Sequence, residues 1–311
     1  MTARNNIILT SFYNECIKIV MFDRYIEVEQ LPAWVVEDNV MFQIVDSYSH
    51  CVYENVKKVK LPFQIKIPAL TDGKYTLHIY YKSKTKRNFF IGLNTSNGFP
   101  FQIINNNVTT IIGKPFEGNK ELFLRLNDEF VDSHNNSTIP YDQFIPQEII
   151  TLAHKIIRTS FSNYDKILAI HDWVAENIYY DYDSIEDNSY MLQKKDALSV
   201  LRKRRTVCSG YSELVRTLLR AVGVPAINMD CFALNAMIDG GWEKESNMSD
   251  AANHVITFAY ADDRWIMLDT TWDSDNEYRH GEYQQKGGHG VSHQYFDCTL
   301  AFFSYTHRFI K

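Results

Sequence analysis

Three residues that together make a nucleophilic catalyst follow one another in the second half of this chain. Cys208 lies in residues 206–211 (TVCSGY), where a basic stretch gives way to a strongly amphipathic segment. His254 and Asp269 come later, each on a segment with the composition of a strand. A thiol at a helix start, an imidazole that takes its proton and a carboxylate that orients the imidazole form a nucleophilic catalyst. The sequence therefore predicts covalent chemistry at Cys208.

The thiol of Cys208 needs help to ionise, because a cysteine reacts as thiolate and a free thiol is mostly protonated at neutral pH. The N-terminus of a helix favours negative charge through the helix dipole. Residues 202–205 (RKRR) add positive charge nearby, although exposed arginines are largely screened by salt. A histidine beside the sulfur has the larger effect, since it forms a thiolate–imidazolium pair.

His254 is the best candidate for that base among the ten histidines of the chain. It opens an apolar segment, which a turn at residues 261–263 separates from a second strand ending at Asp269. In an antiparallel hairpin the start of one strand faces the end of the next. The separation, 269 − 254 = 15 residues, suits two strands of about six residues and a short turn. We therefore expect Asp269 to orient the His254 ring.

Helical periodicity dominates the region around Cys208. After this residue, apolar side chains form one stripe with charged residues opposite, and Gly223 followed by Pro225 ends the pattern. Further helices are predicted around residues 149–157, around residues 167–178 with Asn163 as the cap, and around residues 197–201. Residues 270–295 are predicted to be loop.

The first part of the chain, up to about residue 130, is predicted to be β. Residues 75–81 alternate between apolar and polar side chains directly after a turn at residues 71–73 (TDG), which is typical of a half-buried strand. Similar strands are expected at residues 16–20, 25–29, 40–45 and, between two prolines and therefore at a sheet edge, 61–68. Short strands separated by turns favour an Ig-like β-sandwich.

Length and composition indicate two domains. The chain has 311 residues, which is more than a single hydrophobic core usually holds. With 45% hydrophobic and 23% charged residues, its composition is that of an ordinary globular protein. The polar, Asn-rich stretch at residues 132–140 is the best candidate for a linker. We predict an α+β protein with a β-sandwich domain at residues 1–135 and a second, helix-containing domain at residues 141–311.

Charge, apolar windows and cysteines limit the partners. The net charge of −6 argues against nucleic acid, which selects basic faces. No window of 18 or more apolar residues is present, so no membrane span is expected. The first residues lack the pattern of a signal peptide, which favours a cytoplasmic location. The five cysteines are odd in number and irregularly spaced, which favours reduced thiols.

Two other interpretations stand beside catalysis. Cys208 and His254 are core residues in the first, with Asp269 as a turn carboxylate. In the second the three bind a metal, but zinc cysteines usually have close-spaced partners and no Cys-x-x-Cys occurs. An acidic cluster in residues 181–187 suggests calcium, although a solvated loop explains it better. We therefore predict neither a metal nor a cofactor.

The chain resembles the transglutaminase-like superfamily of papain-fold cysteine enzymes over about residues 145–311. The resemblance rests on short segments in the order Cys, His, Asp: 172–181 (DWVAENIYYD), 207–212 (VCSGYS), 222–226 (VGVPA), 253–255 (NHV) and 268–273 (LDTTWD), with Tyr295, Phe296 and His307 near the end. It implies a papain-like core, with a helix that carries the nucleophile packed on an antiparallel sheet that carries the histidine and aspartate.

The resemblance also implies acyl transfer on a protein or peptide substrate. Cys208 would attack an amide carbonyl to form a thioester, His254 would protonate the leaving amine, and Asp269 would hold His254. We expect hydrolysis by a protease or amidase, because crosslinking needs a water-shielded channel for an amine and the sequence shows no sign of one. Protein-glutamine crosslinking is the alternative. A non-catalytic scaffold that binds protein or glycan is the alternative of another class.

Overall fold

The computed structural model describes residues 5–10, 16–22, 24–31, 39–48, 50–58, 60–82, 90–92, 99–110, 116–136, 145–159, 161–234, 242, 252–285 and 291–310. The chain forms two compact units. The first comprises residues 1–116, 234–248 and 288–307, and the second comprises residues 117–233, 249–287 and 308–311. Among the described residues, none of the helices is both long and apolar enough to cross a lipid bilayer. The predicted division into a β-sandwich domain at residues 1–135 and a second domain at residues 141–311 stays a prediction.

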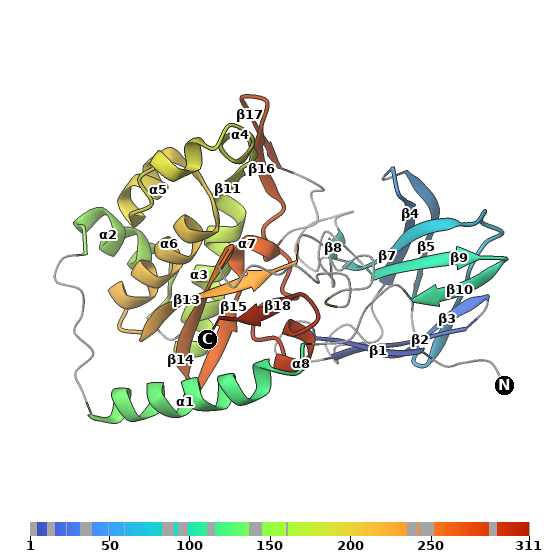
Figure 1. Ribbon diagram of the computed structural model, residues 1–311, viewed down its shortest axis with the longest axis horizontal. Helices are drawn as coiled ribbons and strands as arrows, with labels where there is room; N and C mark the ends of the chain where they lie inside the picture. Colours follow the sequence, from blue (N-terminus) through green and yellow to red (C-terminus); the bar gives the residue numbers. More distant parts are fainter. Residues whose placement is uncertain are drawn as a thin grey trace. The chain divides into compact units, whose positions relative to one another are not determined.

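Two antiparallel sheets make up most of the first unit (Figure 1). One has the order β1-β2-β3-β6, formed by Asn5–Thr10, Cys16–Met21, Tyr25–Gln30 and Phe63–Lys66. The other has the order β10-β9-β7-β4-β5, formed by Asn107–Thr110, Phe99–Ile104, Gly73–Lys82, Asn39–Asp46 and Cys51–Lys58, with β8 (Phe90–Gly92) paired to β7. The predicted edge position of the proline-flanked strand is confirmed, since β6 ends the first sheet.

The core of the first unit follows from period-two patterning. Tyr75, Leu77 and Ile79 of β7 are buried, and polar residues alternate with them. The ring of Phe42 on β4 lies 5.1 Å from that of Phe63 on β6, so side chains of the two sheets meet. The one-turn helix α8 (Leu300–Phe303) also belongs to this unit.

Helix α1 (Asn119–Asn136) corrects the prediction that residues up to 130 are β and that the linker starts at residue 132. Its anchors come from strands far away in the sequence. Phe123 packs 6.2 Å from Phe258 and 6.4 Å from Phe309, measured between ring centroids. The side-chain oxygen of Asn119 accepts the backbone N–H of Phe309 at 2.9 Å. These tertiary contacts stabilise a segment whose own pattern is weak.

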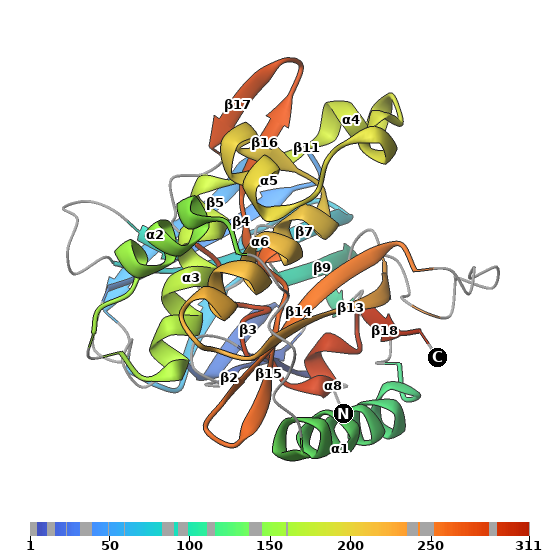
Figure 2. The ribbon, with the colours of Figure 1, turned by 90° about the vertical axis from the view of Figure 1, so that its left-hand side faces the viewer.

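In the second unit a central helix packs against a sheet. The helices are α2 (Gln147–Ile156), α3 (Asn163–Asn177), α5 (Ala197–Lys203) and α6 (Cys208–Ala221). The sheet has the order β15-β14-β13-β18, formed by Arg264–Leu268, His254–Ala261, Ala226–Ala233 and His307–Phe309. Helix α6 packs on β13 and β14 and is covered by α2, α3 and α5 (Figures 1 and 2). The mixed α+β class is therefore confirmed.

The predicted helices occur close to their expected positions. Asn163 was predicted as the cap of α3, but Ser162 is the N-cap residue. Its hydroxyl accepts the N–H of Asp165 at 3.1 Å, and the Asp165 carboxylate accepts the N–H of Ser162 at 3.0 Å. This reciprocal capping box satisfies two N–H groups, whereas a cap at Asn163 would satisfy one.

Residues 270–295 are not a continuous loop as predicted. They contain α7 (Thr270–Asp273) and a hairpin of β16 (Asn276–Arg279) and β17 (Glu282–Gln285). The hairpin joins β11 (Tyr179–Asp181) and β12 (Arg205–Thr206) in a second sheet of the order β12-β11-β16-β17. Its turn has two left-handed residues, His280 and Gly281, whose short polar sequence resembles loop. A short helix α4 (Tyr182–Glu186) and a 3₁₀ helix (Ser189–Leu192) follow β11.

Candidate active site

Cys208 is the first residue of α6, directly after the edge strand β12. Its side chain is half-buried. The turn that leads into the helix is tight, because a Cβ atom added to Gly210 would collide with the side chain of Thr206. The close approach of Thr206 therefore leaves no room for a side chain at this point of the motif.

Strand β14 is fastened to the start of α6 by its first residues. The hydroxyl of Ser212, one turn after Cys208, donates to the carbonyl oxygen of Val255 at 2.9 Å. The backbone N–H of Val255 in turn donates to the sulfur of Cys208. Asn253, just before the strand, bonds through its side chain to both the N–H and the C=O of Ala233, at 2.8 and 3.0 Å. His254 is thus held on a fixed backbone between α6 and β13.

His254 and Asp269 form a buried, hydrogen-bonded pair. Nε2 of His254 lies 2.8 Å from Oδ2 of Asp269, and both residues are almost fully buried. The second carboxylate oxygen of Asp269 accepts the N–H of Trp272 at 3.1 Å, so Asp269 also caps α7. The ring of Trp272 lies 6.1 Å from that of His254, in a tilted arrangement.

The ionisation of Cys208 and His254 is coupled. Burial by itself raises the pKa of the Cys208 thiol, but the hydrogen bond to His254, the charge of the ring and the N–H of Val255 outweigh it, so this pKa lies below its ordinary value. Burial disfavours the charged ring of His254, yet the charge and hydrogen bond of Asp269 and the bond to Cys208 raise its pKa to about 10. The pair therefore favours thiolate and imidazolium.

The structure brings all three predicted residues together. Nε2 of His254 faces Asp269, which leaves Nδ1 as the ring nitrogen for the sulfur. The hairpin that carries the pair turns at two residues, Asp262 and Asp263, both left-handed, where three were predicted. Two such residues match the twist of the strands better than a longer turn.

Tyr180 belongs to the surroundings of Cys208, although the sequence did not single it out. It lies on β11, and burial together with the nearby charges of Cys208 and Asp269 raises the pKa of its phenol. Its ring contacts that of Tyr182 at 4.9 Å in an edge-on arrangement. The signal was present in the run of tyrosines at 179–182, but nothing in the pattern separated a site tyrosine from a packing one.

The acidic residues that suggested calcium bind donors of the protein itself. Asp181 is buried and accepts hydrogen bonds from Gln193 at 3.0 Å and Lys203 at 3.3 Å. Asp183 accepts the backbone N–H groups of His280 and Gly281 at 2.7 and 2.8 Å. Both carboxylates fix loops in the second unit.

Residues 150–270 match the family model of the transglutaminase-like superfamily. The predicted resemblance is confirmed for these residues. They include Cys208, His254 and Asp269 and the helix and strands that carry them.

Kyphoscoliosis peptidase is among the curated proteins with similar sequences. The mouse protein is 24% identical and the human protein 23% identical, each over 123 residues, which are 40% of this chain. The chain spans 18% of the length of these relatives. The crystal structure of a "putative protease" from Parabacteroides distasonis is 12% identical, with a TM-score of 0.30 over 89% of this chain and 67% of that one.

Proposed function

We propose that this chain is a cysteine-dependent acyl-transfer enzyme that hydrolyses peptide or side-chain amides through a thioester at Cys208. The observation that carries the proposal is the linked arrangement at the start of α6. The sulfur of Cys208 is hydrogen-bonded to the ring of His254, and the pKa of the thiol is lowered. Nε2 of His254 lies 2.8 Å from Oδ2 of Asp269. A binding module has no use for an ionised thiol beside a charged imidazole.

In the proposed reaction the thiolate attacks the carbonyl carbon of the amide and forms a tetrahedral oxyanion. When the C–N bond breaks, the imidazolium of His254 gives its proton to the leaving amine, and the acyl group stays on sulfur as a thioester. The ring, now neutral, takes a proton from water, and the resulting hydroxide attacks the thioester. The sulfur leaves as thiolate and the carboxylic acid product loses its proton to solvent, so the Cys208 thiolate and the His254 imidazolium are restored. Asp269 keeps the ring oriented throughout.

The oxyanion needs donors close to the sulfur. The N–H of Cys208 belongs to the first turn of α6, where N–H groups have no partner within the helix. We assign the second donor to Tyr180, whose phenol interacts electrostatically with Cys208 and is protonated at neutral pH, as an ordinary phenol is. A neutral phenol donates a hydrogen bond without adding charge.

Hydrolysis is favoured over crosslinking by the names of the similar proteins, which are peptidases. The substrate is then a protein or peptide. We also propose that helix α6 and the sheet β15-β14-β13-β18 form a papain-like core. The two sheets of the first unit would form a β-sandwich of Ig-like type, supported by the meeting of Phe42 and Phe63.

The proposal is tested by incubating the full chain with a peptide library, with and without a primary amine, and reading the products by mass spectrometry. Hydrolysis of a backbone amide gives two shorter peptides, and deamidation changes the mass of a glutamine or asparagine side chain. Amine incorporation gives a third mass change and indicates crosslinking instead. The Cys208→Ala variant is the matched control and must abolish the product.

A second control separates chemistry from binding. Cys231 is fully buried on β13 and its pKa is raised, so Cys231→Ala removes a thiol close to the site without touching the nucleophile. Cys231→Ala should keep the product that Cys208→Ala loses. If neither the parent chain nor Cys231→Ala forms any product that Cys208→Ala lacks, the scaffold interpretation replaces the enzyme.

A further inference from the structure

Helix α7 joins the candidate site to the helical layer through its two ends. It consists of one turn, Thr270–Asp273, and Asp269 is its N-cap. The carboxylate of Asp269 accepts the N–H of Trp272 at 3.1 Å and faces His254 with its other oxygen. The carbonyl of Asp269 accepts the N–H of Asp273 at 3.1 Å. Any movement of this turn therefore moves the carboxylate that orients the imidazole.

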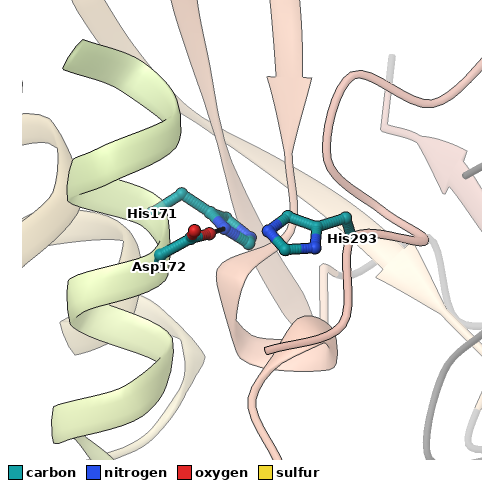
Figure 3. A group of neighbouring side chains, drawn as sticks. All are labelled: His171, Asp172 and His293. Carbon is teal, nitrogen blue, oxygen red and sulfur yellow. Dashed lines mark hydrogen bonds and ion pairs between the residues drawn. The ribbon is translucent and has the colours of Figure 1, made fainter. Parts of the chain in front are cut away.

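The far end of α7 is held by a buried ion pair. Oδ2 of Asp273 lies 3.2 Å from Nε2 of His171 on α3, and both side chains are fully buried. The other ring nitrogen of His171 lies 3.0 Å from Oδ1 of Asp172, its neighbour on the same helix (Figure 3). The ring stands between two carboxylates, one from α3 and one from α7.

His171 is charged in this setting. Burial disfavours its cationic form, but the hydrogen bonds and charges of Asp172 and Asp273 raise its pKa to about 9. Both ring nitrogens then carry protons and donate to the two carboxylates. Such charge-assisted hydrogen bonds hold their partners in a narrower geometry than neutral ones.

Three hydrogen bonds from two further residues, Ser274 and Asn276, attach the segment after α7 to the last turn of α3. The hydroxyl of Ser274 donates to the carbonyl of Ala175 at 2.8 Å. The side-chain amide of Asn276 donates to the carbonyls of Ala175 and Glu176, at 3.1 and 2.7 Å. A single helical turn has almost no internal hydrogen bonds of its own, so contacts like these determine its position.

We propose that His171 and Asp273 are positioning residues, which hold α7 on α3 so that Asp269 stays against His254. The inference rests on the proposed function, because it assigns the pair a purpose in keeping the thiolate–imidazolium pair formed. A contribution to stability does not by itself explain why the chain has the His171–Asp273 ion pair. A buried ion pair is often no more stabilising than apolar residues of the same volume.

The direction in which the thiol pKa of Cys208 shifts shows whether Asp273 acts by positioning Asp269 or only through its charge. In Asp273→Asn a negative charge disappears near the site while Asp172 still holds the ring of His171 in its charged form, so by charge alone the thiol pKa of Cys208 falls. If Asp273 acts by holding α7 in place, the variant leaves Asp269 less well positioned against His254. The pKa of His254 then falls, and the pKa of the Cys208 thiol rises. An upward shift therefore reports the loss of positioning.

The experiment is the pH dependence of iodoacetamide labelling of Cys208 in the full chain, resolved by mass spectrometry. We expect Asp273→Asn to raise the midpoint by about half a pH unit and to slow labelling at neutral pH by up to about three-fold. Asp273→Glu keeps the carboxylate and should recover part of the rate. Ile149→Ala, which removes a buried side chain on α2, is the control for lost stability and should keep the parent midpoint.

The double variant His171→Gln/Asp273→Asn leaves no unpaired charge in this pair and serves if the single variant fails to fold. The double variant should also raise the labelling midpoint of Cys208, because a hydrogen bond between two neutral amides holds α7 on α3 more weakly than the ion pair does. A midpoint equal to or below that of the parent chain, in whichever of the two variants folds, overturns the inference. If Cys208 of the parent chain itself labels no faster than the exposed Cys51, the proposed function fails instead.

Discussion

The hydroxyl of Ser212 donates to the backbone carbonyl of Val255 at 2.9 Å and thereby joins the nucleophile helix to the histidine strand. Ser212 lies one turn after Cys208, and Val255 follows His254 directly. Val255 is bound twice through its backbone, since its N–H donates to the sulfur of Cys208. The distance between thiol and imidazole thus depends on backbone contacts as well as on the two side chains.

Replacing Ser212 by alanine should slow the reaction of Cys208 without unfolding the chain. The variant leaves the carbonyl of Val255 without this donor, and one lost buried hydrogen bond costs about 1–3 kcal/mol. We expect kcat of the identified reaction to fall about ten-fold, since small displacements of a catalytic pair reduce the rate strongly. Steady-state kinetics and urea unfolding measure the two effects.

Thr217→Ala is the matched control for this variant. Thr217 lies on the same helix, and its hydroxyl donates within α6 to the carbonyl of Glu213 at 2.8 Å. It should lose a little stability at most and keep its kcat. Equal losses of kcat in both variants would contradict a special part for the Ser212–Val255 bond.

The ionisation of Cys208 should depend on His254. The thiol pKa is lowered because the imidazole outweighs the effect of burial. In His254→Ala the burial remains and the stabilising partner is lost, so the pKa of Cys208 should rise above its ordinary value. Labelling rates measured from about pH 5 to about pH 10 give the midpoint of each variant. A midpoint that stays the same in His254→Ala would falsify the thiolate–imidazolium pair.

Gly210→Ala should disturb the start of α6. The new methyl group collides with the side chain of Thr206 on β12. In a helix interior, alanine normally stabilises relative to glycine by about 1 kcal/mol, so a loss of stability here reveals the close approach. Thermal unfolding measures it. The double variant Gly210→Ala/Thr206→Ala removes two of the three nearest contacting atoms and should regain part of the loss; no recovery argues against this collision.

The site was easier to predict from the sequence than its supports. Cys208 stood out because a helix of strong periodicity starts there, and His254 and Asp269 because a hairpin brings strand ends together. Each of these signals is local. The roles of Ser212 and Asp273, by contrast, depend on partners 43 and 102 residues away in the sequence, and no local pattern reports such distances.

The same reason explains where the fold departs from prediction. Helix α1 was read partly as strand and partly as linker, because its apolar residue Phe123 finds its partners only at Phe258 and Phe309. Strands β16 and β17 were predicted to be loop, because their partner is the distant strand β11: β16 pairs with it, and Tyr283 of β17 packs on Tyr179. Segments that are stabilised mainly by contacts with distant elements cannot be predicted from their local propensity.

The stability of the second unit should fall at alkaline pH. The pKa of His171 is raised from 6.5 to about 9 by Asp172 and Asp273, in spite of burial. A folded-state pKa above the unfolded value means that the contribution is complete below about pH 6.5 and is lost as the pH rises through about 9. The loss is on the order of 3 kcal/mol.

Urea unfolding at several pH values across this window measures the decrease. His254, whose pKa is raised to about 10, adds to the decrease across the same window and continues it up to about pH 10. The variant His171→Gln/Asp273→Asn lacks the titrating ring and should show a flatter profile between about pH 6.5 and about pH 9. Identical slopes in the parent chain and the variant would assign the decrease to other groups.

Tyr180→Phe should lower kcat more than KM. The phenol of Tyr180 interacts electrostatically with Cys208, and like any phenol it is protonated at neutral pH and able to donate. An oxyanion donor acts on charge that develops only in the transition state, and loss of one such donor lowers kcat about 10²-fold. Tyr182→Phe is the control, because its ring contacts that of Tyr180 and lies under Arg279. If Tyr180→Phe raises KM and leaves kcat unchanged, the phenol binds substrate uniformly and the second donor must be sought elsewhere.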